Sequence, residues 1–250
     1  MTGKRGALGA IKGLLYMRVQ ELMTGPALFR AAAVFAASFG LLLLLRLDPD
    51  DAAEQFQGLV GSTFALVFLP IYCLTKGGET LRAELKDGTI EYLWVRPVSK
   101  VELYVGFFLS GLLGTLAIVG PSLLGISLAG MVLGIVDFTG LATLWLTAIA
   151  VVFSFSAVSG LFGSLSSKFV VLGILYYAFI ELGLEQIPNG VQRVAITFHA
   201  EELLAGLTDS SGAASFSSYL WICGAGLVAL GLGAAIFSQS RYVAGSEKES

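Results

Sequence analysis

Six apolar segments, each long enough to cross a lipid bilayer, constrain what this chain can fold into. The hydrocarbon core of a bilayer is about 30 Å thick, and a helix needs about 20 mainly apolar residues to cross it. The predicted spans are 27–47, 58–75, 103–128, 141–161, 169–187 and 218–238, of which the second and the fifth are short. Only 13% of the residues are charged, about half the share found in soluble domains. We therefore predict an all-α integral membrane protein, with one transmembrane domain over residues 1–250.

Lysine and arginine residues between the spans predict which side of the membrane each loop occupies. Cytoplasmic loops of membrane proteins carry an excess of these two residues. Four precede the first span, and five lie in loop 76–102: Lys76, Arg82, Lys86, Arg96 and Lys100. The alternate loops instead collect acidic residues: Asp48, Asp50, Asp51, Glu54, Asp137, Glu201, Glu202 and Asp209. We predict a multi-pass protein of the cell (cytoplasmic) membrane, with its N- and C-termini in the cytoplasm.

The segment before the first span, 7–23, has a moderately amphipathic helical pattern. Arg18 falls inside the apolar sector of this pattern, among Ile11, Leu14, Leu15, Val19 and Leu22. An amphipathic helix of this kind lies in the plane of the membrane interface. We therefore predict an in-plane, interfacial N-terminal helix. A turn at Gly25-Pro26 would follow it into the first span, because proline suits the first turn of a helix.

Loop 76–102 is much longer than the turn that two packed helices need. Apolar residues recur in it at near-helical spacing, and Gly88 is expected to end a first short helix. Arg96-Pro97 is expected to end a second, because the residue before proline avoids helical geometry. Ser99 and Glu102 have the spacing of a capping box at the start of the third span. This pattern predicts a helix–turn–helix against the inner leaflet, with a face of mixed charge left exposed.

This loop and the order of the spans resemble the permeases of type-2 ABC exporters. The positions that carry the resemblance are Glu84, Gly88, Thr89, Glu91, Tyr92, Leu93, Arg96, Pro97, Val98, Ser99 and Lys100. It extends to the in-plane N-terminal helix, the six spans and the inside termini. It also covers the outer loop 188–217, where these permeases often carry short, half-buried helices.

The resemblance implies that loop 76–102 holds a coupling helix between the second and third spans. In that family the coupling helix contacts a cytoplasmic ATPase subunit and passes its closing motion to the spans. The implied contact residues are Arg82, Glu84, Lys86, Asp87, Gly88, Thr89, Glu91, Tyr92 and Arg96. The alternative is a re-entry turn whose charges only hold it out of the lipid, and the length of the loop favours transmission.

The chain lacks a phosphate-binding loop of the form GxxxxGK[ST]. Gly163–Lys168 reads GSLSSK, without the second glycine and the final Lys-Ser/Thr pair. We therefore expect a transport subunit rather than an enzyme, with no cofactor on this chain and with ATP and Mg on the partner. A six-span chain is half of such an exporter. This predicts two ATPase copies and a second permease subunit, in a homodimer rather than a heterodimer.

Glu181, inside the fifth span, is the candidate residue of the translocation path. A carboxylate inside a membrane is costly and suggests a function. It could line the path or pair across a dimer seam. It could equally accept hydrogen bonds from neighbouring helices or stay protonated, and the sequence leaves these alternatives open.

The sequence argues against a hydrolase and against a metal site. Its one histidine, His199, lies in the outer loop, whereas Ser159 and Ser164 lie at the inner end of the fourth span. A helix of about 20 residues separates the two ends by about 30 Å. One histidine and two scattered cysteines, Cys73 and Cys223, give no zinc site, and we read both cysteines as core packing.

The predicted function is therefore an ATP-driven export permease that works by alternating access. Its rival is an ATP-independent membrane transporter or a membrane scaffold subunit of a larger complex. Ion-coupled carriers usually have repeated halves with interrupted spans, and no convincing repeat occurs here. Membrane lipids are expected partners, and the net charge of −3 argues against nucleic acid. The apolar interior and short outer loops favour a lipid-like, peptide or amphipathic cargo.

Overall fold

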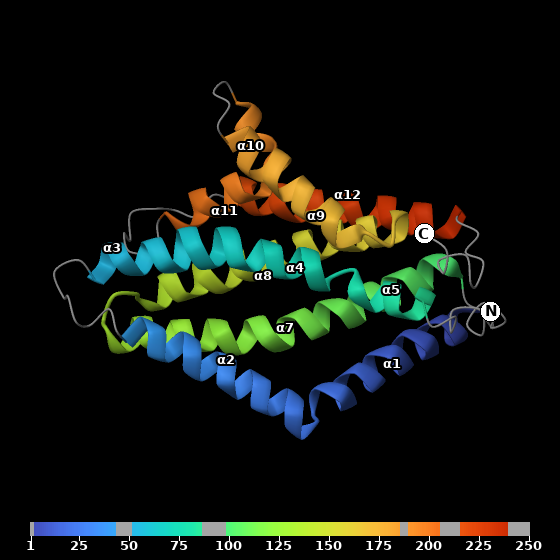
Figure 1. Ribbon diagram of the computed structural model, residues 1–250, viewed down its shortest axis with the longest axis horizontal. Helices are drawn as coiled ribbons and strands as arrows, with labels where there is room; N and C mark the ends of the chain where they lie inside the picture. The colour runs from blue at the N-terminus through green and yellow to red at the C-terminus, as the bar shows by residue number, and fades with distance from the viewer. Residues whose placement is uncertain (1–2, 44–51, 87–98, 186–189, 206–215, 240–250) are drawn as a thin grey trace.

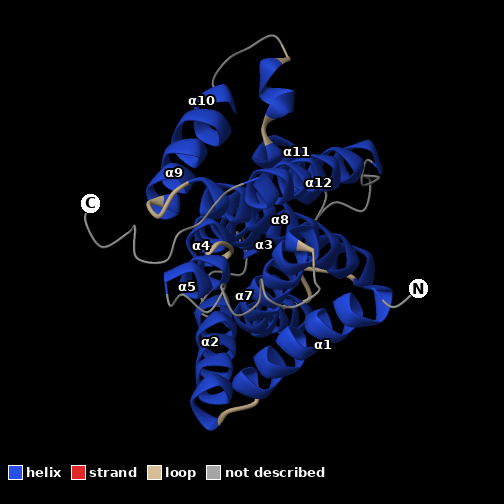
Figure 2. Ribbon diagram, turned by 90° about the vertical axis from the view of Figure 1, so that its right-hand side faces the viewer, coloured by secondary structure: helices blue, strands red, loops and turns tan. Residues whose placement is uncertain are grey.

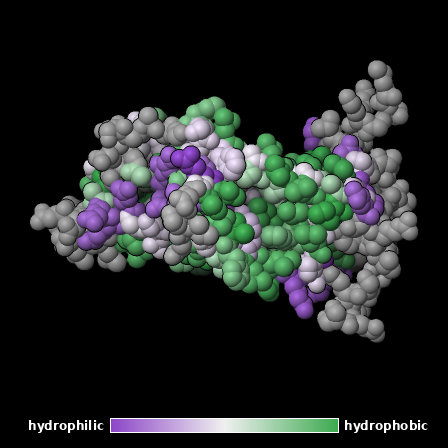
Figure 3. Space-filling view, turned by 90° about the horizontal axis from the view of Figure 1, so that it is seen from above, coloured by the Kyte–Doolittle hydropathy of each residue, from purple (hydrophilic) through white to green (hydrophobic). Residues whose placement is uncertain are grey.

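The computed structural model describes residues 3–43, 52–86, 99–185, 190–205 and 216–239, and every regular element among them is a helix. Five helices are long and apolar enough to cross a membrane: Gly25–Leu43, Ala53–Lys86, Lys100–Val132, Phe138–Leu165 and Phe216–Gln239. They run roughly along the long axis of the molecule (Figure 1). Seen from above in Figure 3, the middle of the molecule is mainly hydrophobic and hydrophilic residues gather towards its two ends. An all-helical membrane protein is thus confirmed.

The elements follow the predicted segments, with two differences in length. The helices are α1 (Gly3–Leu22), α2 (Gly25–Leu43), α3 (Ala52–Gln57), η2 (Gly58–Phe68), α4 (Leu69–Lys76), α5 (Glu79–Lys86), α7 (Lys100–Val132), α8 (Phe138–Leu165), α9 (Phe169–Tyr176), η3 (Tyr177–Glu181), α10 (Leu182–Glu185), η4 (Val191–Val194), α11 (Ile196–Leu204) and α12 (Phe216–Gln239). The second predicted span is part of a 34-residue helix, so the expectation that it is short was wrong. The fifth coincides with the shorter apolar helix Phe169–Leu184, and a sixth crossing there stays a prediction.

Local signals fix where α7 and α8 begin. The predicted capping box is present: the Glu102 backbone N–H donates to Ser99 Oγ at 3.2 Å, and the Ser99 N–H donates to Glu102 Oε2 at 3.0 Å. Asp137 caps α8 by accepting the Gly140 N–H at 2.7 Å. Between the two helices, Gly134 has a φ of 67°, a conformation that suits glycine because it has no Cβ. These caps satisfy backbone donors that a helix start leaves without partners.

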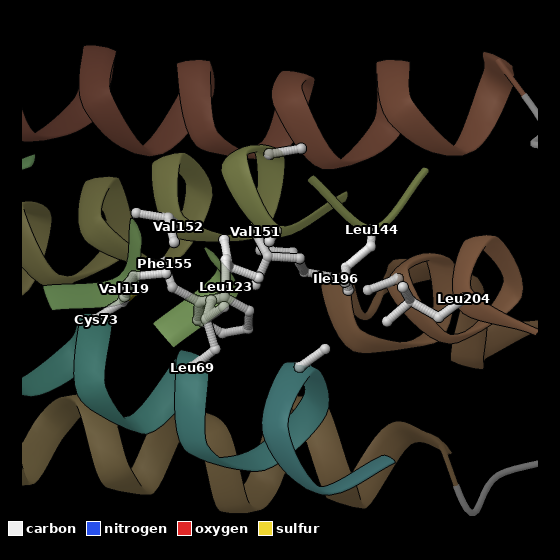
Figure 4. Close-up of a cluster of buried hydrophobic side chains, with 14 of the residues drawn as sticks. Leu69, Cys73, Val119, Leu123, Leu144, Val151, Val152, Phe155, Ile196 and Leu204 are labelled. Carbon is white, nitrogen blue, oxygen red and sulfur yellow. The ribbon is translucent and has the colours of Figure 1, made fainter. Parts of the chain in front are cut away.

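The packed core is centred on α8. Helices α4, α7 and α12 pack around it, and Figure 4 shows Leu69, Leu123, Val151 and Phe155 among the side chains that meet in this core. Buried serines also help to hold the helices together, as where Ser154 Oγ donates to the Ile222 carbonyl of α12 at 2.7 Å. Small side chains let helices approach closely in lipid, where the hydrophobic effect cannot drive one helix onto another.

Helices α1 and α2 form a V on the side of this core opposite α9 and α10 (Figures 1 and 2). Helix α2 packs mainly on α7, where Ser38 Oγ and Ser122 Oγ lie 2.8 Å apart. Helix α1 contacts the first half of α7, with Ile11 and Leu14 beside Gly106. A helix is therefore present where one was predicted, and the chain turns at Met23-Thr24, directly before Gly25 and Pro26 begin α2. The placement of α1 in the membrane plane stays a prediction.

Candidate functional site

Within the predicted coupling loop the structure describes residues 76–86 and 99–102, and α5 follows closely after the second span. Gly77 and Gly78 form a two-residue turn between α4 and α5, with hydrogen bonds from Gly77 N–H to Cys73 O at 2.7 Å and from Arg82 N–H to Gly78 O at 3.1 Å on its two sides. Gly77 keeps helical angles, φ −59° and ψ −40°. Helix α5 thus follows the second span into the polar loop with only a two-residue turn between them.

The two glycines allow α4 and α5 to press against α8. A Cβ on Gly77 would lie 2.8 Å from Ser156 Cα, and a Cβ on Gly78 would lie 2.8 Å from the Ser159 carbonyl oxygen. On the other side, a Cβ on Gly111 of α7 would lie 3.0 Å from the Gly77 carbonyl oxygen. The root of α5 is therefore wedged between the backbones of α7 and α8.

Ser159 fastens this wedge through two hydrogen bonds. Its Oγ donates to the Leu74 carbonyl at 2.7 Å and accepts the Gly78 N–H at 2.9 Å. Ser159 is fully buried, so water cannot replace either bond and its loss would leave a buried donor without a partner. We call Gly77, Gly78, Gly111 and Ser159 the α5 root.

Of the predicted contact residues, three lie on α5: Arg82, Glu84 and Lys86. Each is at least partly accessible to solvent, and Leu81 on the same helix is buried. The helix thus carries charge on an accessible face and is anchored by apolar and backbone contacts on the other. Asp87, Gly88, Thr89, Glu91, Tyr92 and Arg96 lie outside the described residues.

The second and fifth spans share an unusual backbone and are joined by a hydrogen bond. Residues Gly58–Phe68 of the one and Tyr177–Glu181 of the other are π-helical. The Tyr177 hydroxyl donates to the Leu66 carbonyl at 2.5 Å. Segments of π-helix are rare and often mark functional sites, so these two spans are the part of the bundle whose backbone departs most from regular packing.

Glu181 is completely buried and accepts three hydrogen bonds. Tyr176 donates its hydroxyl at 2.6 Å, and Thr197 donates both its backbone N–H and its Oγ–H at 2.9 Å. Thr197 lies in the first turn of α11, whose N-cap residue, Ala195, has no side-chain hydrogen bond to offer. The carboxylate therefore caps α11 from another helix, at the end where the helix dipole favours negative charge. These contacts match the hydrogen-bonding alternative, and a role in the translocation path stays a prediction.

His199 belongs to a small polar cluster between α11 and α12. Its Nε2 lies 2.9 Å from the Arg193 carbonyl oxygen and its Nδ1 lies 3.3 Å from Ser218 Oγ, while Ser218 donates to Glu202 Oε2 at 2.7 Å. Ser218 is buried, with 1% of its surface exposed, so its hydroxyl is not placed to attack a substrate. The cluster ties the two helices together.

The sequence reasoning missed the α5 root and the bond between Tyr177 and Leu66. The Gly77-Gly78 pair at the start of the polar loop was an available signal, since adjacent glycines mark either a turn or a close backbone approach. No signal in the sequence pairs Ser159 with Leu74. Across the described residues, no group of three or more His, Cys, Asp or Glu side chains could hold a metal ion.

Comparison with known proteins gives one assignment. The family model described as ABC-2 family transporter protein matches residues 26–181, from the start of α2 to the end of η3. No curated protein and no solved structure matched the chain significantly. The matched region contains the α5 root, both π-helical segments and four of the five long helices. The chain therefore belongs to the ABC-2 type transporter permeases, a family of membrane transport subunits.

Proposed function

We propose that this chain is the transmembrane permease subunit of an ATP-driven exporter and works by alternating access. Two copies of the chain would pair with two ATPase subunits, which bind ATP and Mg²⁺. The end of the molecule that carries α5 would face the cytoplasm. The first residues of α1 and the last of α12 lie at this same end (Figure 1), as the predicted inside termini require.

The observation that carries the proposal is the α5 root. A segment that only kept a loop out of the lipid would not need its backbone wedged between two spans. With Ser159 bonded to both Leu74 and Gly78, a push on α5 acts directly on α8, the most buried of the long helices. The charged face of α5, with Arg82, Glu84 and Lys86, would receive that push from the ATPase.

The translocation path would run between two copies, along the second and fifth spans. Ser62 and Thr63 on η2 are exposed, as are Ile174 and Phe179 on the fifth span. A path with these residues on its walls would be mainly apolar with a few hydroxyls, which suits an amphipathic cargo. The hydrogen bond from the Tyr177 hydroxyl to the Leu66 carbonyl would keep the two spans together as they move. Glu181 stays the acidic candidate beside this path.

Charge reversal on α5 tests the proposal. Glu84→Lys should abolish transport and the dependence of the partner's ATP hydrolysis on this chain, while membrane insertion stays normal. Glu54→Lys is the matched control, because Glu54 is exposed on α3, at the opposite end of the molecule (Figure 1). Unchanged transport and ATP hydrolysis in Glu84→Lys would contradict transmission through α5.

A further inference from the structure

A polar cavity lies between the α1–α2 V and helices α4, α5 and α7. Its volume is about 860 Å³, and its charged lining consists of Arg18, Arg30, Lys76, Glu21, Glu79 and Glu84. Leu22, Leu28 and Ile118 line it as well. A cavity of this size holds a small molecule or the headgroup of a lipid. Its mixture of charge and hydrocarbon is unlike the apolar core around α8.

The length of α7 places the cavity near one edge of the membrane, which is the inner edge in the orientation of the proposed function. Helix α7 has 33 residues and is therefore about 50 Å long, whereas the hydrocarbon core needs about 20 residues. Its far end is apolar and exposed at Met131 and Val132, and its first turn carries Lys100 and Glu102. Counting back about 20 residues from Val132 places Gly111 and Gly114, which line the cavity, at the boundary between headgroups and acyl chains.

An unpaired hydrogen-bond donor on Arg18 is the first reason to expect a ligand in the cavity. Its guanidinium lies directly on Gly114, so close that a Cβ on this glycine would overlap it. Nη1 pairs with Glu21 at 2.6 Å, but Nε is buried without a hydrogen-bond partner among the residues that the structure describes. A buried donor that stays unpaired costs about 1–3 kcal/mol. The arginine that interrupts the apolar sector of α1 therefore keeps one N–H donor unpaired beside α7.

The charges around the cavity are balanced, which restricts the class of ligand. Among the described residues, Arg30 donates only from Nε, to the Pro26 carbonyl at 3.3 Å, and a guanidinium has five N–H donors. Lys76 is paired with Glu79 at 2.7 Å. With three cations and three carboxylates in the lining, a simple anion would meet as much repulsion as attraction. A group with one phosphate and one ammonium can satisfy both sets.

We propose that the α1–α2–α7 cavity binds a phosphoethanolamine headgroup of an inner-leaflet phospholipid. The phosphate takes hydrogen bonds from Arg18 and Arg30, since guanidinium groups match phosphate geometry. The ammonium donates to the carboxylates of Glu21 and Glu79. The acyl chains leave along the apolar part of the lining, beside Leu28 and Ile118. This site belongs to the single chain, and it requires neither the ATPase nor transport.

Lipid retention by the full-length chain tests the site. The protein is reconstituted in vesicles of equal parts phosphatidylethanolamine, phosphatidylglycerol and phosphatidylcholine with identical acyl chains. The protein is then extracted in mild detergent, and native mass spectrometry identifies and quantifies the lipids that stay bound to it. We expect phosphatidylethanolamine to be retained about tenfold over each of the others, because one charged hydrogen bond supplies about that factor. Equal retention of the three lipids, or preference for phosphatidylglycerol, would overturn the proposal.

Two variants separate the site from general charge effects. Arg18→Ala should lower phosphatidylethanolamine retention about tenfold, whereas Lys168→Ala should leave it unchanged, because Lys168 is exposed at the start of α9 and does not line the cavity. Gly114→Ala keeps the charge but displaces the guanidinium, and it should also lower retention. Its control is Gly120→Ala on the same helix, where a Cβ meets nothing within 4 Å. Wild-type retention in both Arg18→Ala and Gly114→Ala would overturn the site.

A soluble competitor distinguishes a lipid from a free headgroup. Excess phosphoethanolamine without acyl chains should not displace the bound lipid, because the chains contribute apolar contacts that the free headgroup lacks. Displacement at the same concentration would overturn the assignment to a lipid.

Discussion

The packed core around α8 and the α1–α2 V differ in how far their helices are buried, although α8 and α2 are both apolar enough to cross a membrane. Of the most apolar window of α8, 67% is buried inside the chain, whereas the figure for α2 is 11%. Helix α8 contacts α4, α7 and α12 through glycines and serines, while α2 rests mainly on α7. Hydropathy alone therefore identifies a membrane helix but not whether it is surrounded by protein or by lipid.

This difference in burial indicates different roles for the core and the V. The core holds the α5 root in place and can receive a push without losing its packing. The V encloses a charged cavity and packs mainly on a single helix of the core, α7, so it can adjust to a ligand or to a neighbouring copy. Substitutions in the core should therefore cost stability, and the same substitutions in the V should cost little.

Alanine at Gly78 should show the largest effect. The added Cβ would lie 2.8 Å from the Ser159 carbonyl oxygen, and α5 would have to move away from α8. Forced overpacking of this kind costs about 3 kcal/mol. Gly40→Ala in α2 is the matched control, because its Cβ meets nothing within 4 Å. Reversible unfolding in mixed micelles, followed by circular dichroism, gives the free energy of unfolding of both variants. Equal stabilities would contradict the proposed difference between the core and the V.

Ser159→Ala should come next. It removes the acceptor for the Gly78 N–H and the donor to the Leu74 carbonyl, and it leaves a buried donor unpaired. We expect a loss of about 2 kcal/mol in the same unfolding experiment. A threonine at this position keeps the hydroxyl and should recover part of the loss. If alanine were as stable as the native serine, the α5 root would not depend on this bond.

Glu181→Gln should have a smaller effect on stability, because an amide oxygen can still accept the Thr197 N–H. The lost charge at the start of α11 is worth about 1 kcal/mol. Hydrogen exchange at Thr197 should become faster, whereas Glu54→Gln, on the exposed surface of α3, should leave it unchanged. An unaltered exchange rate would argue against the capping role. Altered export would favour the translocation path.

Ser38→Ala should have the smallest effect. Ser38 joins α2 to Ser122 of α7 through a single hydroxyl pair at 2.8 Å. Such bonds between membrane helices are worth about 0.6 kcal/mol on average. A loss of stability as large as that of Ser159→Ala would mean that α2 is held as tightly as the core helices. It would contradict the proposed difference between the core and the V.

The sequence predicted those features that depend on composition or on neighbouring residues. The apolar segments gave the five long helices, and Ser99 with Glu102 gave the start of α7. The contacts of Glu181 were not predictable, because Thr197 approaches it only after the chain has turned back through η4. Gly77-Gly78 reads as a helix breaker in sequence and does form a turn, but the sequence could not show that its neighbours on α7 and α8 leave no room for a side chain. Arg18 interrupts the apolar face of α1 in the sequence, and in the structure this residue lines the charged cavity.

Photo-crosslinking from α5 tests most directly whether force enters the permease there. A photoreactive amino acid is placed at Lys86, at the end of α5, and at Lys168 as a control. After illumination of whole cells, the adducts of the full-length chain are identified by mass spectrometry. We expect an ABC ATPase as the main adduct at Lys86 and much less of it at Lys168. An absence of ATPase adducts at Lys86, or labelling of that position only by reagents outside the cell, would contradict the proposed function.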